Sequence, residues 1–120
     1  MANKNNSNLI IYQKYLKLID YTNNIVKKYP KSETFGLVKE IKSSLYYGFK
    51  LIMYAVKTYN TNKKLNYLNE LDINLDLLKV YIRLSYKYQY ISMQNYNSWC
   101  NLLTEICNML GGWINSCQKR

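Results

Sequence analysis

The chain of 120 residues carries 17 lysine and arginine residues against 7 acidic ones, which gives a formal net charge of +10. A chain of this length forms one domain and can bury a core without disulfides or a structural metal. It contains no histidine, so the commonest general base and the commonest zinc ligand are missing. It also lacks a Cys-x-x-Cys pair and a glycine-rich phosphate loop. We therefore predict that the protein is not an enzyme and uses no cofactor or metal.

The positive charge is concentrated in the first half of the chain. Residues 1–64 hold 12 lysines and three acidic residues, whereas residues 65–120 hold 5 basic and 4 acidic residues. This excess favours an acidic partner, most often nucleic acid, although an anionic membrane surface fits the same balance. The polar N-terminus and the absence of an apolar run near ~18 residues lead us to expect a cytoplasmic protein. The odd number of cysteines predicts core thiols: Cys100, Cys107 and Cys117.

Apolar residues recur at steps of three and four along most of the chain, which predicts helices. Residues 1–7 are expected to be a disordered polar tail, and residues 8–120 a single domain. Pro30 ends the first helix, residues 60–64 form a loop, and Ser32 and Ser92 are predicted N-caps. The expected helices span about 8–29, 32–59, 65–90 and 92–116. Four long helices with short turns predict an all-α, antiparallel up-down-up-down four-helix bundle.

Two apolar stripes on the first helix fill more than half of its circumference. A helix this apolar is buried on two sides, which predicts a cyclic homo-oligomer. Two adjacent glycines on the last helix cost roughly 1 kcal/mol each, which indicates that something packs close to their backbone, and Gly48 is interpreted in the same way. The predicted helix-packing or oligomer residues are Tyr15, Leu18, Ile25, Gly111, Gly112 and Trp113.

Basic residues form a stripe on the second helix, outside its apolar seam. Six positions fall within an arc of about 80° and span roughly 27 Å: Lys39, Lys42, Tyr46, Lys50, Met53 and Lys57. The first helix repeats the pattern within about 60°, with Lys14, Lys17, Tyr21 and Lys28. Lysines with an aromatic among them suit a phosphate backbone and stacked bases. The alternative is a solvated face of a lysine-rich protein.

The third helix adds three basic residues at successive steps of four: Lys79, Arg83 and Lys87. Asp72 and Asp76 share this face, so a binding role and a structural role both stay open for these residues.

The C-terminal run Glu105-Ile-Cys-Asn-Met-Leu-Gly-Gly-Trp113 follows a helix with regularly spaced leucines and then Arg83-Leu84. Together these residues resemble the accessory variability determinant (Avd) proteins of diversity-generating retroelements. The segment Tyr29-Pro-Lys-Ser-Glu33, followed by Phe35-Gly-Leu37, is similar to the first interhelix turn of that family and of the wider four-helix-bundle proteins encoded in ribosomal RNA intervening sequences. The resemblance covers roughly residues 12–114.

The resemblance implies a non-enzymatic bundle that forms a pentameric barrel, binds template-repeat RNA and its cDNA, and associates with the retroelement's reverse transcriptase. Arg83 matches the family's basic residue on the third helix, whereas the family's Gly-Arg is Cys107-Asn108 here, which removes one basic position. One alternative is a protein-interaction module of the intervening-sequence group without RNA binding. A membrane-surface role is disfavoured because inserting the core seams into lipid would unfold the bundle.

Overall fold

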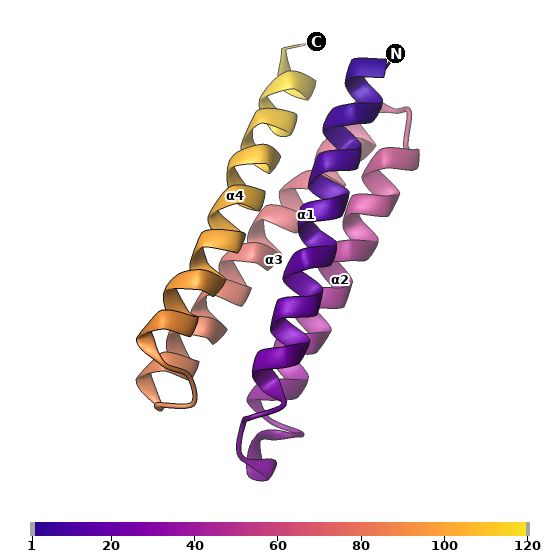
Figure 1. The fold of residues 1–120 in the computed structure, drawn as a ribbon. Coiled ribbons are helices and arrows are strands. Elements are labelled where there is room, and N and C mark those ends of the chain that lie inside the picture. Colours follow the sequence, from indigo (N-terminus) through magenta and orange to yellow (C-terminus); the bar gives the residue numbers. More distant parts are fainter. Residues whose placement is uncertain (1, 120) are drawn as a thin grey trace.

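The computed structural model describes the backbone of residues 2–119 and the side chains of residues 10–119. Four long helices and one short turn of 3-10 helix make up this part of the chain, which contains no strand (Figure 1). The predicted all-α class with four helices is confirmed. The elements are α1 (Ala2–Val26), η1 (Lys31–Glu33), α2 (Leu37–Lys57), α3 (Thr61–Lys87) and α4 (Met93–Gln118).

Each long helix packs against two others. α1 lies between α2 and α4, and α3 contacts the same two helices from the other side. In Figure 1 both termini lie at one end of the molecule, and the α1–α2 and α3–α4 connections lie at the opposite end. The result is an elongated body with extents of 46 × 24 × 18 Å.

The core is formed by apolar residues that recur at helical spacing on each of the four long helices. On α4, Trp99, Leu103, Ile106 and Leu110 are buried, while Trp113 and Cys117 pack half-buried against the core. The indole N–H of Trp99 donates to the hydroxyl of Thr22 on α1 at 3.0 Å, so this large side chain is buried without an unpaired donor. The buried seams of the other helices are Ile11, Tyr15, Leu18 and Ile25 on α1, Ile41, Leu45, Ile52 and Ala55 on α2, and Leu68, Leu71, Leu75, Leu78 and Ile82 on α3.

At Gly48 of α2, the Tyr15 side chain of α1 packs directly against the backbone. A Cβ at this position would lie 2.1 Å from the Tyr15 hydroxyl and 3.0 Å from the Asn74 amide nitrogen. Tyr15 is fully buried, and its hydroxyl donates to the Leu45 carbonyl at 2.6 Å. Only a residue without a side chain leaves room for this phenol. The close approach that the sequence predicts at Gly48 is therefore confirmed.

A buried polar pair joins α2 to α3 beside the same glycine. The Ser44 hydroxyl donates to the Asn74 side-chain oxygen at 3.0 Å, and the Asn74 amide donates to the Ser44 carbonyl at 2.7 Å. Because an unpaired polar group is costly in the core, this reciprocal pair stabilises one register of α3 against α2.

The prediction for Gly111 and Gly112 is wrong within the protomer. Both residues are exposed, and nothing lies within 4 Å of a Cβ built on either. Tyr15, Leu18 and Ile25, which we assigned to helix packing or an oligomer contact, are buried inside the bundle, so their role is helix packing.

The helix boundaries depart from the predictions mainly at the N-terminal ends. α1 begins at Ala2, before the predicted start near residue 8, because residues 2–7 contain no glycine or proline to stop a helix. The predicted N-cap Ser32 lies in η1, and α2 begins later, at Leu37, whose N–H donates to the Glu33 carboxylate at 3.0 Å.

The boundaries of α3 and α4 are set by side-chain caps. Asn60 accepts from the Lys63 N–H at 3.0 Å, so α3 starts at Thr61 rather than near residue 65. Ser92 accepts from the Asn95 N–H at 3.1 Å, which confirms it as the N-cap of α4.

Candidate nucleic-acid interface

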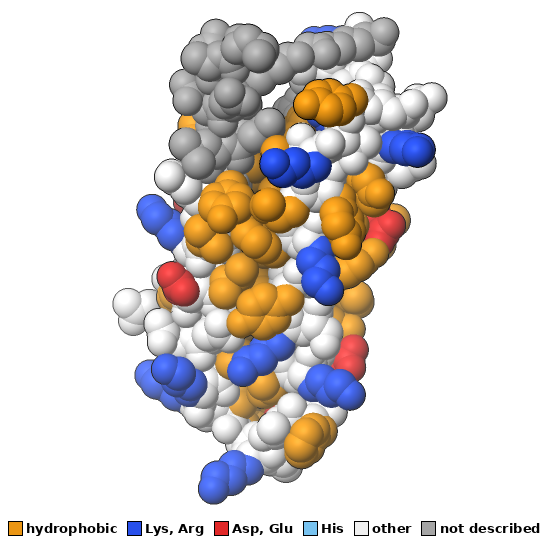
Figure 2. Space-filling view, turned by 90° about the vertical axis from the view of Figure 1, so that its right-hand side faces the viewer, with side chains coloured by type: hydrophobic (Ala, Val, Ile, Leu, Met, Phe, Trp, Pro, Cys, Tyr) orange, Lys and Arg blue, Asp and Glu red, His pale blue; other side chains and the backbone are white. Residues whose placement is uncertain are grey.

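Six residues of α2 form the surface that we name the α2 stripe: Lys39, Lys42, Tyr46, Lys50, Met53 and Lys57. All four lysines are exposed, Tyr46 is 44% exposed and Met53 is half-buried. Since all six lie within one continuous helix, the lysines project from a rigid rod about 27 Å long. Figure 2 shows lysine and arginine side chains beside a run of hydrophobic ones on the side of the molecule where α2 lies.

The lysines of the α2 stripe have no acidic partner among the described residues. The salt bridges in this part of the chain join Lys14 to Glu105 and Lys79 to Asp76. Glu40, the acidic residue of α2, lies near Tyr81 of α3 and raises the pKa of that phenol in addition to the effect of burial. Unpaired ammonium groups at this spacing can release counterions from a phosphate backbone.

The α2 stripe is held in place by aromatic contacts to α1. The Phe49 ring lies 5.2 Å from the Tyr12 ring and 6.0 Å from the Tyr15 ring. The Tyr46 hydroxyl accepts a hydrogen bond from the Asn23 side chain at 2.9 Å, which fixes one edge of that ring while leaving part of it exposed. The stripe is thus presented by a helix whose opposite face belongs to the core.

The basic residues of α1 do not extend this surface. Lys14 pairs with Glu105 of α4, and this ion pair lowers the pKa of the Glu105 carboxyl below its ordinary value. The Tyr21 hydroxyl donates to the Asn95 carbonyl of α4 at 3.3 Å. Lys14 and Tyr21 therefore face α4, whereas Tyr12 and Asn23 face α2.

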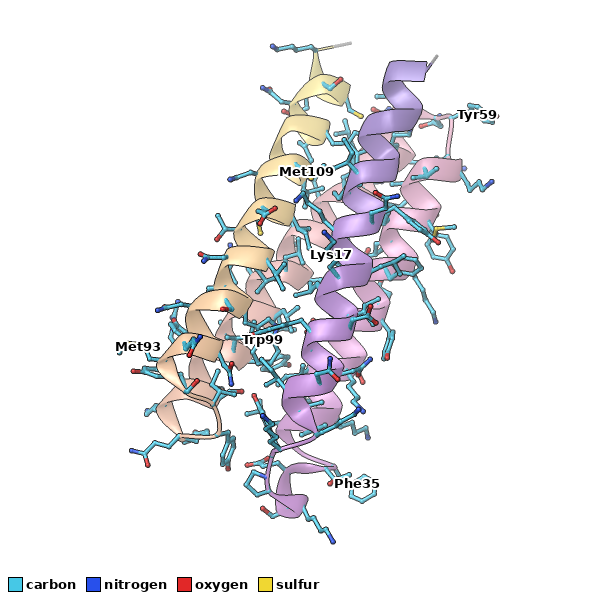
Figure 3. The ribbon with its side chains drawn as sticks, viewed as in Figure 1. Lys17, Phe35, Tyr59, Met93, Trp99 and Met109 are labelled. Atoms are coloured by element: carbon cyan, nitrogen blue, oxygen red, sulfur yellow. The ribbon has the colours of Figure 1, made fainter. Side chains whose placement is uncertain are left out.

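Lys17 and Lys28 are both exposed. Lys17, which is labelled in Figure 3, lies close enough to Glu105 for its charge to add to the lowering of the Glu105 pKa that Lys14 mainly causes. Lys28 lies beyond Val26, where α1 ends, so the predicted helical arc does not include it. The residues of the predicted stripe on the first helix therefore have separate roles: Lys14 forms a salt bridge, Tyr21 packs against α4, and Lys28 lies in the turn after α1.

The basic residues of α3 are partly neutralised. Lys79 lies 3.6 Å from Asp76 and also lies beside the Cys107 thiol. Burial raises the pKa of this thiol, and the Lys79 ammonium opposes the shift. Arg83 and Lys87 are exposed. The contact with Asp76 therefore neutralises part of the charge on this face.

Two surface features were missed by sequence reasoning. The outer face of α3 carries the exposed apolar residues Ile73, Leu77 and Val80, which are 70%, 44% and 44% exposed. Their spacing of four and three residues was available in the sequence but was hidden by the stronger core seam beside it. Phe35, treated only as part of a turn, is 87% exposed and borders an open hollow at the start of α2.

Among the described residues, no group of three or more histidine, cysteine or acidic side chains is placed to hold a metal ion. The three cysteines are half-buried and unpaired by disulfides. In the part of the chain that the structure describes, none of the helices has the length and apolar character needed to cross a membrane.

The fold and surface define a small basic bundle of four helices whose second helix presents unpaired lysines. More particularly, the chain belongs to the bAvd-like family, whose family model matches residues 9–117. The resemblance to the Avd proteins is therefore confirmed. A comparison with curated proteins found no match.

Among solved structures, the chain is similar to a protein of unknown function from the S23 ribosomal protein family of Bacteroides thetaiotaomicron. The TM-score is 0.81, the sequence identity is 21%, and the match covers 91% of this chain and 98% of the other. At this identity the likeness establishes the shared fold.

Proposed function

We propose that the protein is a non-enzymatic accessory protein of a diversity-generating retroelement. As an up-down-up-down bundle, it binds template-repeat RNA through the α2 stripe and associates with the reverse transcriptase that copies this RNA into mutagenised cDNA. Its contribution is electrostatic attraction and positioning rather than bond chemistry. Membership of the bAvd-like family supports this role, and the chemistry of α2 supports the RNA contact.

The proposed RNA contact rests on one observation. The four exposed lysines of α2 have no acidic partner among the described residues. Lys39, Lys42, Lys50 and Lys57 follow one side of one helix. If each neutralises one phosphate of single-stranded RNA, the binding constant falls with a logarithmic salt slope of about −2.8. Between 50 and 200 mM salt this slope corresponds to a loss of affinity of about 50-fold.

The proposed assembly is a homo-oligomer, with the pentamer taken from the family resemblance. The exposed apolar face of α3 supports association, because Ile73, Leu77 and Val80 would leave water when a second subunit covers them. Gly111 and Gly112 remain proposed contacts of this kind, since open space around both admits another backbone. A ring of such protomers would join several basic α2 faces on one particle.

The test compares RNA binding by the wild-type protein and by two variants with equal loss of charge. The α2 four-lysine variant carries Lys39→Gln, Lys42→Gln, Lys50→Gln and Lys57→Gln. The control variant replaces four exposed lysines outside the stripe: Lys27, Lys31, Lys63 and Lys119, each changed to glutamine. Fluorescence anisotropy with a labelled single-stranded RNA measures affinity, and light scattering on the same samples measures the mass.

We expect the α2 four-lysine variant to lose most of its RNA affinity with unchanged mass and helix content, and the control variant to retain most of it. Equal losses in both variants would mean that net charge, rather than the α2 stripe, determines binding. A wild-type protein that binds no RNA even at low salt would favour the protein-interaction module, for which the apolar face of α3 is the docking surface.

A further inference from the structure

Phe35 is an exposed aromatic residue at one end of the α2 stripe. Its ring points away from the bundle at the turn before α2, and 87% of the residue is exposed (Figure 3). It borders an open hollow of about 460 Å³. The hollow is lined by Thr34, Phe35, Val38, Lys39, Lys42, Ser43 and Tyr46.

The backbone around Phe35 is held by hydrogen bonds on both sides. The Glu33 carboxylate accepts from the Leu37 N–H at 3.0 Å and from the Tyr90 hydroxyl at 2.7 Å. The Gly36 N–H donates to the Glu33 carbonyl at 3.0 Å. Exposure of Phe35 is therefore a feature of a fixed turn, and a ligand that contacts the ring meets a surface that is already ordered.

The far wall of the hollow is a second fixed aromatic ring. Tyr46 is tied to Asn23 through its hydroxyl and keeps part of its ring exposed. Lys39 and Lys42 also line the hollow, and no acidic side chain lines it. Apolar rings beside unpaired cations complement a ligand that combines a flat aromatic group with negative charge.

We propose that this hollow binds one unstacked nucleobase of a single-stranded RNA. Phe35 is the stacking platform, Tyr46 forms the opposite wall, and Lys39 and Lys42 contact the phosphates on either side of the base. The site deepens the proposed function and rests on it, because the same strand continues along the α2 stripe. It gives the protein a preference for single-stranded over duplex RNA, in which the bases are stacked and unavailable.

The test uses Phe35→Ala with a single-stranded RNA and with a duplex formed by the same strand. Since stacking is uncharged, we expect affinity for the single strand to fall by about 5-fold to 100-fold while the salt slope stays unchanged. Affinity for the duplex should be unchanged. Phe35→Trp should retain wild-type affinity, and its added fluorescence should be quenched by the single strand.

Tyr59→Ala is the matched control, because Tyr59 is fully exposed at the other end of α2 (Figure 3). It should leave affinity for the single strand unchanged. Wild-type affinity in Phe35→Ala, or an equal loss for single strand and duplex, would overturn the base site. If Phe35→Ala has no such effect but the α2 four-lysine variant still loses RNA affinity, the proposed function stands without this base site. Absence of any RNA binding by the wild-type protein would overturn both.

Discussion

Replacement of Gly48 by alanine tests the contact between the α2 backbone and the Tyr15 side chain of α1. A Cβ at this position would lie 2.1 Å from the Tyr15 hydroxyl, which is fully buried and bonded to the Leu45 carbonyl. The phenol cannot swing into solvent, because its ring also packs against Phe49 at 6.0 Å. Accommodation of the methyl group therefore requires α1 and α2 to move apart, which also separates the Tyr15 hydroxyl from its acceptor on α2.

The expected cost is the balance of three effects. Overpacking costs about 1–3 kcal/mol, and a buried hydroxyl without its acceptor costs about 1–3 kcal/mol. The higher helix propensity of alanine returns about 1 kcal/mol. The free energy of unfolding should therefore fall by about 3 kcal/mol, and the melting temperature should fall on the order of 10 °C.

Urea unfolding followed by circular dichroism, at one fixed protein concentration, measures this difference. The Tyr15→Phe background supplies the control, because removing the hydroxyl leaves the nearest atoms 3.0 Å from the new methyl group. In that background the cost of Gly48→Ala should shrink by about 1 kcal/mol or more. An alanine variant as stable as the wild type would refute the proposed close contact.

Two further predictions concern hydrogen bonds that fix the helices. Asn74→Ala should lower the free energy of unfolding by about 2–3 kcal/mol, because it removes a buried hydrogen-bond partner of Ser44. Adding Ser44→Ala to this variant should cost little more. If chemical denaturation shows that the two losses add, the pairing is contradicted. Hydrogen bonds from Leu37 and Tyr90 lower the pKa of Glu33 from its ordinary value of 4.5. Its contribution to stability is therefore fully present above pH 4.5 and is lost as the pH falls from 4.5 through the lowered pKa of the folded state. Glu33→Gln should therefore melt at a lower temperature than the wild type at pH 7, and the difference should shrink as the pH is lowered below 4.5. A difference that does not change with pH would count against the carboxylate contacts.

The core was predictable from the sequence because burial follows helical periodicity. The seam through Trp99, Leu103, Ile106 and Leu110 is one uninterrupted series at steps of three and four, and all four residues are buried. Ser92 was predictable as an N-cap because a serine directly before an amphipathic segment commonly accepts a hydrogen bond from a free backbone N–H of the first helical turn.

The partners of polar side chains were not predictable, because they depend on which helices become neighbours. Lys14 and Glu105 are 91 residues apart, so their ion pair is invisible to a helical wheel of α1 alone. The start of α2 was misplaced for a related reason: Ser32 had the chemistry of a cap, but Glu33 reached the first free N–H instead. Gly111 and Gly112 lie on the surface of the protomer, because glycine in a helix does not by itself identify what packs against it.

The salt dependence of RNA binding by the α2 four-lysine variant tests the central claim most directly. The four substituted lysines are exposed along one helix and account for about 2.8 units of logarithmic slope with single-stranded RNA. The account predicts that the slope of the variant is shallower than that of the wild type by about this amount, and that the control variant keeps a slope near the wild-type value. Parallel salt plots for the wild type and the α2 four-lysine variant would contradict the claim that the α2 stripe contacts phosphate.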